Sequence, residues 1–249
     1  MKVGFTALAL FDISFNEIIQ RAHADGFDIV EVLCEGPYLP RYALKNTAQF
    51  EILFQYNIEL TIHSPTVDLN PASVNIGIRE ETFKQLYETV DLAASIDAST
   101  VTTHPGYIKR INEKLTMRSL DLALHGLEKW AKYADDVGIE PAIENMPRSS
   151  KHFCTDVEEH KLFVETCGAS ATIDVGHAHT NNAIREFLQA DFQVVYHHVN
   201  DNDGHRDQHL PIGEGTIDWD QLRGINKAII EVNDYDAVKE SRNELTRLS

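Results

Sequence analysis

Short β-rich runs alternate with longer segments of helical spacing along the whole chain, and this alternation limits the folds open to it. The eight runs are Val3–Ala7, Phe27–Leu33, Ile58–His63, Thr100–His104, Ile139–Glu144, Ala171–Asp174, Phe192–His198 and Ala228–Val232. Between the first two runs, Phe15, Ile18, Ile19 and Ala22 recur at the spacing of one helical face. Repeated strand–helix units of this kind predict a parallel sheet.

Residues typical of helix starts and helix ends lie at the boundaries between the helical segments and the strand-like runs. Ser14 with Glu17, and Thr155 with Glu158, have capping-box spacing, in which a hydroxyl and a later carboxylate satisfy free amides at a helix start. Three glycines stand where a helix should end and a strand begin, in a left-handed conformation: Gly26, Gly138 and Gly168. Local signals and the long-range pattern therefore predict the same element boundaries.

Eight units without a linker favour one closed (β/α)8 barrel, the TIM-barrel fold, as a single domain over residues 1–249. The length of 249 residues suits one such barrel. An open, doubly wound sheet is the alternative architecture. Hydrophobic residues make up 43% of the chain and charged residues 24%, an ordinary globular composition that argues against a disordered, fibrous or membrane protein.

The chain is strongly acidic, with 22 Lys and Arg against 39 Asp and Glu and a formal net charge of −17. This balance gives no general attraction to a phosphate backbone or an anionic membrane. An anionic substrate must then be recruited locally, by bound cations or by a few basic residues at one mouth. The 12 histidines suit the first of these sources.

Cysteine usage and the start of the chain bear on location. Cys34, Cys154 and Cys167 are odd in number and lack CxxC spacing, which predicts reduced, buried thiols. Met1–Phe5 leads into a strand-like run without a signal-peptide pattern, and no apolar run reaches membrane length. We therefore expect a soluble, cytoplasmic protein with no membrane partner.

Residues that can bind metals collect at the strand ends, where the active sites of parallel barrels lie. Six runs deliver a histidine or a carboxylate there, namely His63, His104, Glu144, Asp174, His198 and Glu231. The loops after the sixth and seventh runs add His177, Asp207 and His209. Imidazole and carboxylate together suit zinc, manganese, iron or cobalt, and this many donors exceed what one ion uses. The sequence therefore predicts a metal cluster, and purely structural hydrogen bonds are the alternative.

The seven other histidines are expected outside this cluster, and His179 and His205 lie near the rim without being expected as ligands. Four fall in helices or long loops and should face solvent: His23, His125, His152 and His160. His197 alternates with His198 along its strand and should therefore pack against the outer helices.

Seven short motifs together resemble those of the xylose isomerase-like TIM barrel superfamily, which joins sugar phosphate isomerases and epimerases to endonuclease IV (AP endonuclease family 2). They are His63–Pro65, Asp68–Asn70, Thr103–Gly106, Ile143–Asn145, Asp174–Ala178, His198–Asp201 and Asp207–Gly215. The resemblance covers essentially the whole chain.

The two branches of this superfamily imply different metal sites. The isomerase and epimerase branch holds one divalent ion, such as manganese or cobalt, at positions that match Glu144, Asp174, His198 and Glu231. The endonuclease IV branch holds three zinc ions. Its ligand sets match His63, His104 and Glu144; Glu144, Asp174, His198 and Glu231; and His177, Asp207 and His209. All nine positions are present, so the resemblance allows either site.

Other features favour the sugar branch. Asp174–His177 reads Asp-Val-Gly-His rather than the Asp-Thr-Cys-His-like stretch associated with endonuclease IV, and no long basic or aromatic segment is available to enter a duplex. We expect a metal-dependent isomerase or epimerase of a small sugar, sugar phosphate or hydroxycarbonyl, with Glu144 and Glu231 transferring the proton. The expected substrate contacts are Asn145, Lys109, Arg148 and Arg206. Zinc-dependent phosphodiester hydrolysis at abasic sites in DNA is the alternative, and a barrel that only binds metal is a third.

Overall fold

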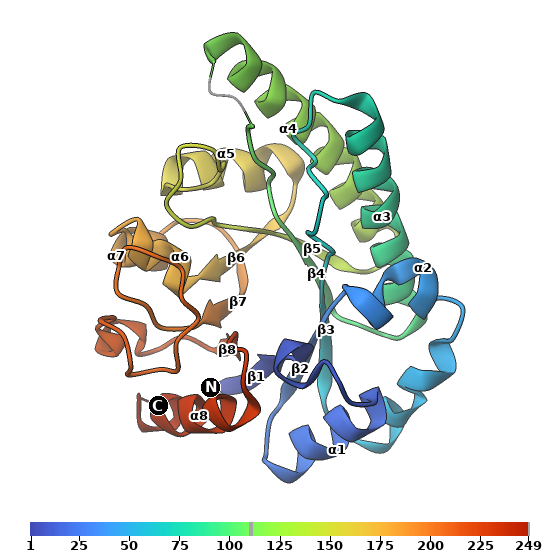
Figure 1. The fold of residues 1–249 in the computed structure, drawn as a ribbon, viewed down its shortest axis with the longest axis vertical. Coiled ribbons are helices and arrows are strands. Elements are labelled where there is room, and N and C mark those ends of the chain that lie inside the picture. The colour runs from blue at the N-terminus through green and yellow to red at the C-terminus, as the bar shows by residue number, and fades with distance from the viewer. Residues whose placement is uncertain (110–111, 249) are drawn as a thin grey trace.

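The computed structural model describes residues 1–109 and 112–248, and these form a closed barrel of eight parallel strands (Figure 1). The strands β1 to β8 are Lys2–Thr6, Ile29–Leu33, Glu59–His63, Thr100–Thr103, Glu140–Glu144, Ser170–Asp174, Val194–Val199 and Lys227–Ile230. Each strand pairs with the next along the chain, and β8 pairs with β1 to close the barrel. The predicted (β/α)8 TIM barrel is confirmed, and the open sheet is wrong.

Helices of very different lengths cover the barrel wall. The α-helices α1 to α8 are Phe15–Ala24, Pro40–Ala43, Ile76–Ser95, Glu113–Asp136, Val157–Cys167, Val175–Thr180, Ile184–Leu188 and Tyr235–Leu248. The 3-10 helices η1 to η4 are Ala7–Leu10, Gly36–Tyr38, Thr47–Gln55 and Trp219–Leu222. The long helices α3 and α4 pack side by side (Figure 1), whereas the connection from β7 to β8 contains only η4 among its described residues.

The predicted helix boundaries hold with one shift. Ser14 caps α1, and its hydroxyl accepts a hydrogen bond from the Glu17 amide at 3.3 Å. The cap of α5 is Asp156 rather than Thr155, with its carboxylate accepting from the Glu159 amide at 2.9 Å. A carboxylate at this position also interacts favourably with the helix dipole, which a threonine hydroxyl does not. The three glycines have φ angles of 73°, 82° and 66° in the order Gly26, Gly138 and Gly168, as predicted.

The inside of the barrel is layered. A small apolar cluster of Ile29, Tyr196 and Ile229 lies toward the start of the strands. Two residues further along, β2 and β7 turn Glu31 and His198 inward, because every second residue of a strand faces the same side, and Glu231 follows directly after β8. The larger hydrophobic core lies outside, between strands and helices. The barrel therefore supports a polar layer on an apolar floor.

Two predictions about the remaining histidines need comment. His23 and His125 are exposed, as expected, and His152 is half-buried. His160 is not exposed, so the expectation that it faces solvent is wrong. It lies on the inner face of α5 with Nε2 2.9 Å from the Ile143 carbonyl oxygen, and burial lowers its pKa to about 4. His197 faces outward and is half-buried.

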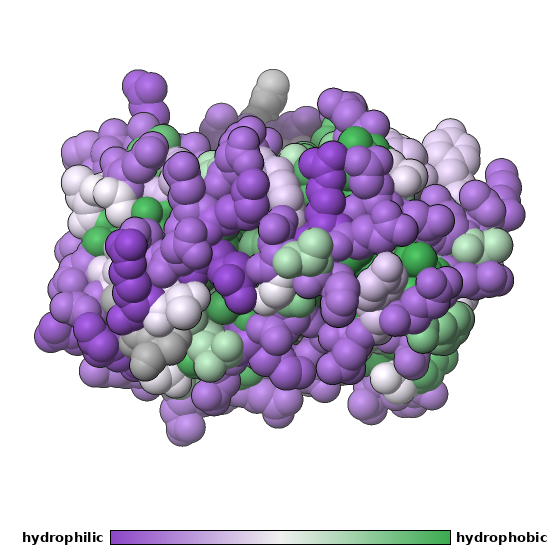
Figure 2. Space-filling view, turned by 90° about the horizontal axis from the view of Figure 1, so that it is seen from below, coloured by the Kyte–Doolittle hydropathy of each residue, from purple (hydrophilic) through white to green (hydrophobic). Residues whose placement is uncertain are grey.

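Figure 2 shows one face that is mostly hydrophilic, with hydrophobic residues only in small, separate patches. Among residues 1–109 and 112–248, no helix combines the length and the apolar character needed to cross a bilayer.

Candidate metal centre

The side chains predicted as ligands meet at the carboxyl ends of the strands. His63, Glu144 and Asp174 are the last residues of β3, β5 and β6. His104 and Glu231 come directly after β4 and β8, and His198 lies one residue before the end of β7. The structure brings all nine predicted ligands into three groups, and within each group the candidate donor atoms lie within 4.8 Å of one another.

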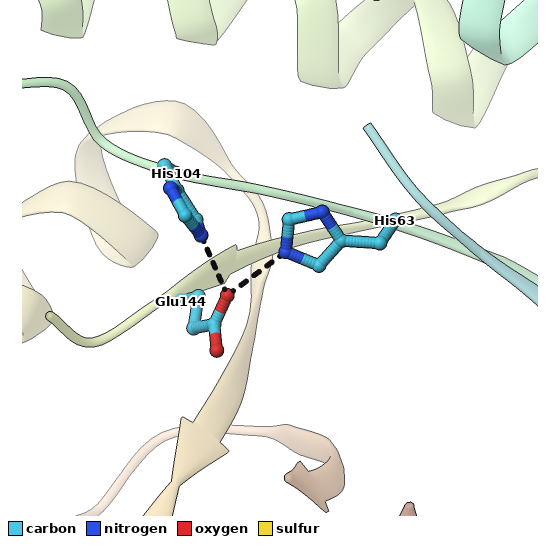
Figure 3. A group of neighbouring side chains, drawn as sticks. All are labelled: His63, His104 and Glu144. Carbon is cyan, nitrogen blue, oxygen red and sulfur yellow. Dashed lines mark hydrogen bonds and ion pairs between the residues drawn. The ribbon is translucent and has the colours of Figure 1, made fainter. Parts of the chain in front are cut away.

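The first group consists of His63, His104 and Glu144, and in Figure 3 both rings point at one carboxylate oxygen. The Nε2 atoms of His63 and His104 lie 3.1 and 3.2 Å from Glu144 Oε2. On the far side of the first ring, His63 Nδ1 lies 2.8 Å from the Ser64 carbonyl oxygen. His63 and Glu144 are buried, whereas the His104 side chain is 31% exposed and lies at the mouth.

The second group contains Glu144, Asp174, His198 and Glu231. His198 Nδ1 lies 2.8 Å from Glu144 Oε1 and 3.8 Å from Glu231 Oε2. Asp174 also caps α6, because its Oδ1 accepts a hydrogen bond from the His177 amide. Glu144 thus belongs to two groups and offers one oxygen to each.

The third group consists of His177, Asp207 and His209. The Nε2 atoms of His177 and His209 lie 3.1 and 3.0 Å from Asp207 Oδ2. Their Nδ1 atoms each lie 2.8 Å from a backbone carbonyl oxygen, that of Asn145 and that of Glu231. The other carboxylate oxygen, Asp207 Oδ1, is buried and has no hydrogen-bond partner.

The ring orientations test whether these residues suit a metal. In His63, His177 and His209, Nδ1 faces a carbonyl oxygen, which can only accept, so Nδ1 carries the hydrogen. A neutral ring would then turn the lone pair of Nε2 toward a carboxylate oxygen about 3 Å away, and that contact is repulsive unless a proton or a cation lies between the atoms. Together with the unpartnered oxygen of Asp207, this arrangement fits divalent cations.

The pKa values of His63 in the first group and His209 in the third are raised, whereas burial lowers that of His104. Burial opposes protonation of His63, but its hydrogen bond to Glu144 and the charge of Glu144 outweigh burial and raise its pKa to about 9. Burial likewise opposes protonation of His209, and its hydrogen bond to Asp207 with the charge of Glu231 raises its pKa to about 10. Binding of a metal ion by these residues would therefore have to displace a proton.

The pKa values of two carboxylates of the site, Glu144 and Asp174, are shifted in opposite directions. Burial favours the neutral acid of Glu144, but the charge of His198 and the hydrogen bonds from neighbouring imidazoles hold its pKa well below the usual range. Burial, reinforced by the charges of Asp207, Glu231 and Glu144, raises the pKa of Asp174 to about 7.

A buried aspartate organises the loop that carries the third group. The carboxylate of Asp201 accepts hydrogen bonds from the Gly213 amide at 2.9 Å, the Ile217 amide at 3.2 Å and the Trp219 indole at 3.0 Å. A Cβ on Gly215 would lie 2.1 Å from Asp201 Oδ1, so only glycine fits there. Asp207 and His209 are therefore held on a loop folded around one carboxylate.

The residues predicted as substrate contacts lie in two environments. Asn145 is buried, and its amide exchanges hydrogen bonds of 2.7 and 3.0 Å with the backbone of Asp174, so it supports a candidate ligand. Lys109, Arg148 and Arg206 are exposed on the loops after β4, β5 and β7, at the same end of the barrel as the three groups. Their contact with a substrate stays a prediction.

Two cavities differ in their relation to the centre. One of about 280 Å³ is lined by His104, Tyr107, Met146 and His152, among others, and so opens beside the first group. A larger one, of about 700 Å³, lies near the starts of β7 and β8, and none of the nine predicted ligands lines it. Of these two cavities, the smaller one adjoins a candidate ligand group.

Sequence reasoning missed one buried residue of the centre, Glu31. Its Oε1 lies 2.9 Å from His198 Nε2. The available signal was an acid in the middle of the otherwise apolar run Ile29–Leu33, at a position that strand alternation places beside Ile29 on the inner face.

Comparisons with known proteins agree with this architecture. A family model described as a xylose isomerase-like TIM barrel matches residues 19–229. An uncharacterised protein of Methanocaldococcus jannaschii is 30% identical over 234 residues, which are 88% of this chain and 77% of that protein. A solved structure described as a D-tagatose 3-epimerase-like protein has 29% sequence identity and a TM-score of 0.87, and the match covers 100% of this chain and 97% of that one.

A further relative comes from the other branch. A protein of Mycobacterium leprae named "Probable endonuclease 4" is 25% identical over 229 residues, which are 84% of each chain. The closed barrel, the ligand groups at its rim and the family match over most of the sequence point the same way. The chain belongs to the xylose isomerase-like TIM barrel family.

Proposed function

We propose that the protein is a divalent-metal-dependent isomerase or epimerase of a small sugar, sugar phosphate or related hydroxycarbonyl compound. The observation that carries the proposal is the second group, in which Glu144 and Glu231 lie with Asp174 and His198 at the carboxyl end of the barrel. The full-length match to a D-tagatose 3-epimerase-like protein supports the substrate class.

The chemistry follows from the two glutamates. A divalent ion held by the second group would stabilise negative charge on the carbonyl oxygen of the substrate. Glu231 removes the proton from the carbon beside that carbonyl, because its side chain is 17% exposed and can reach a ligand in the mouth. Glu144, at 1% exposure, lies deeper on the other side. It would deliver a proton taken from the His63 imidazolium, whose Nε2 lies 3.1 Å from Glu144 Oε2, while the partly exposed Glu231 passes its own proton to solvent. Lys109, Arg148 and Arg206 hold a phosphate where the substrate carries one.

The proposed cofactor follows from the donor set. Imidazole and carboxylate ligands suit manganese, cobalt and zinc alike. Following the two branches of the superfamily, one ion in the second group would be manganese or cobalt, and ions in all three groups would be zinc. Cys34, Cys154 and Cys167 are free and buried, which supports the proposed cytoplasmic location.

Exchange of substrate C–H with solvent deuterium tests the proposal. Metal-replete protein is incubated in D2O with a panel of ketoses and their phosphates, and deuterium incorporation is measured by NMR. We expect exchange at the carbon beside the carbonyl, and we expect Glu231→Gln to abolish it. Glu214→Gln, on an exposed side chain of the β7–β8 connection, is the matched control and should keep full activity. Absence of exchange across the whole panel would refute the isomerase.

The first and third groups favour a second candidate. A single-ion isomerase does not need His63, His104, His177, Asp207 or His209, whereas a three-ion phosphodiesterase would use them all. The relative named "Probable endonuclease 4" supports this candidate too. Its test is a duplex that contains a tetrahydrofuran abasic site: cleavage by the zinc-loaded protein supports hydrolysis, and an intact strand at high protein excess excludes it. Metal analysis separates the candidates independently, since about three equivalents of zinc favour hydrolysis and about one of manganese or cobalt favours isomerisation.

A further inference from the structure

Glu31 lies inside the barrel on β2 and is completely buried. Both of its oxygens have partners: Oε1 lies 2.9 Å from His198 Nε2, and Oε2 lies 2.7 Å from the Tyr196 hydroxyl. Burying a carboxylate away from water is costly even when it is paired, and a well-packed apolar side chain would often serve stability as well or better. Its presence at this position therefore points to a role that an apolar residue could not fill.

A chain of hydroxyl groups fixes the orientation of this carboxylate. The Tyr196 hydroxyl also lies 2.5 Å from Thr102 Oγ1, and Thr102 Oγ1 lies 2.7 Å from Thr172 Oγ1. Since a carboxylate only accepts, Tyr196 donates to Glu31, so Thr102 donates to Tyr196 and Thr172 donates to Thr102. Groups from β2, β7, β4 and β6 thus form one directed network that ends on Glu31.

The opposite edge of the His198 ring faces the second group. With its Nε2 hydrogen donated to Glu31, the ring turns the lone pair of Nδ1 toward the site where Glu144 Oε1 lies 2.8 Å away. The outer hydrogen bond of a metal-binding histidine fixes the tautomer and raises the basicity of the ligating nitrogen. Glu31 makes such a bond through a negative charge, whereas the outer nitrogens of His63, His177 and His209 face neutral carbonyl groups.

We propose that Glu31 is a positioning residue of the metal centre, which holds His198 with Nδ1 as its ligating atom and supports metal binding in the second group. This inference rests on the metal site of the proposed function. Glu31 belongs to none of the three donor groups and acts through the His198 imidazole.

Metal titration of Glu31→Gln tests the proposal. Isothermal titration of metal-free protein with Co²⁺ and with Zn²⁺ gives the affinity and the number of ions bound. We expect the substitution to keep the fold, monitored by circular dichroism, and to weaken one binding event by about 10- to 100-fold, as for other partners of ligating histidines. Glu35→Gln is the matched control. Glu35 follows β2, and its carboxylate accepts hydrogen bonds from the Thr66 and Val67 amides, so this variant should bind metal with wild-type affinity.

A spectroscopic readout separates positioning from packing. In the zinc-loaded wild type, ¹⁵N NMR of the imidazoles should show His198 with hydrogen on Nε2 and the metal on Nδ1, and Glu31→Gln should lose this single state. If Glu31→Gln does not fold, Tyr196→Phe takes its place. It removes the hydrogen bond to Oε2 and keeps the carboxylate, and we expect metal binding about 3- to 10-fold weaker.

The outcomes are distinct. Wild-type affinity and an unchanged tautomer in Glu31→Gln, or in Tyr196→Phe where only that variant folds, would overturn the role of Glu31 and leave the proposed function standing. A wild-type protein that binds neither Co²⁺ nor Zn²⁺ would overturn the metal site itself and this inference with it.

Discussion

Metal binding should release protons from the candidate ligands, and the number released should depend on which of the three groups bind an ion. Burial disfavours the imidazolium form of His177 and His198, but the charges of Asp174 and Glu31 respectively, with further contributions from neighbouring carboxylates, raise their pKa values well above the usual range. His63 and His209 have pKa values of about 9 and about 10. At pH 7.5 the rings of His63 and His209 should therefore hold a proton when no metal is bound, and the raised pKa values of His177 and His198 favour the same state.

The number of protons released differs among the groups. In the first group only His63 gives up a proton, because burial lowers the pKa of His104. In the second group His198 gives up one, and in the third His177 and His209 give up two. One ion in the second group should thus release about one proton, and three ions about four in total.

The pH dependence has a definite sign. Since protons compete with metal below each histidine pKa, apparent affinity rises with pH, about tenfold per unit for each proton displaced. This rise should end near pH 9 for the first group, and the part of it due to His209 in the third group should end near pH 10. Affinity should therefore fall on acidification, most steeply in the third group.

Calorimetry in two buffers measures the proton count. Titration with Zn²⁺ at pH 7.5 in phosphate and in Tris gives binding enthalpies that differ by the protons released multiplied by the difference in buffer ionisation enthalpy. His209→Asn should lower the count by about one, whereas His205→Asn, an exposed position of the same loop, should leave it unchanged. Tight binding with equal enthalpies in both buffers would refute the argument from ring orientation.

Three further predictions concern the scaffold. Since the pKa of His160 is about 4 against an ordinary value of 6.5, the unfolded chain binds the proton first on acidification, so this histidine should cost the fold about 3 kcal/mol between pH 7 and pH 4. Urea unfolding of metal-free protein should show a smaller loss for His160→Phe than for the wild type, with exposed His125→Phe as control, and equal losses would contradict the assignment. Asp201→Asn should destabilise its loop by about 1–3 kcal/mol, because the new amide faces donors, and hydrogen exchange over residues 202–219 should accelerate; unchanged protection would count against the organising role. Gly176→Ala would place Cβ 2.1 Å from Asn200 Oδ1 and should lower stability by about 1–3 kcal/mol, and a melting temperature equal to the wild type would show that the site has room.

Sequence-based prediction succeeded where local rules decide. Strand alternation and the placement of functional groups at strand ends brought six candidate ligands to one rim without any knowledge of distances. The three donor groups in the structure contain the same nine residues that the resemblance implied.

It failed where long-range contacts decide. The partner of Glu31 is His198, 167 positions later, and nothing near Glu31 in the chain indicates that pairing. His160 was misplaced because its partner is the Ile143 carbonyl, and backbone acceptors leave no trace in the pattern of side chains. The cap of α5 moved by one residue because two adjacent side chains, Thr155 and Asp156, compete for one helix start.

The connection from β7 to β8 forms a loop rather than a long helix, and this has a mechanical consequence. An ion bound by the third group would join His177 on α6 to Asp207, 30 positions later, and so act as a reversible cross-link that closes a ring of chain. Removing the metal would free one end of that ring while the barrel stays closed. Limited proteolysis should then cut the metal-free protein first in the exposed turn at Asp203–Arg206, so the loop reports on metal content before the fold does.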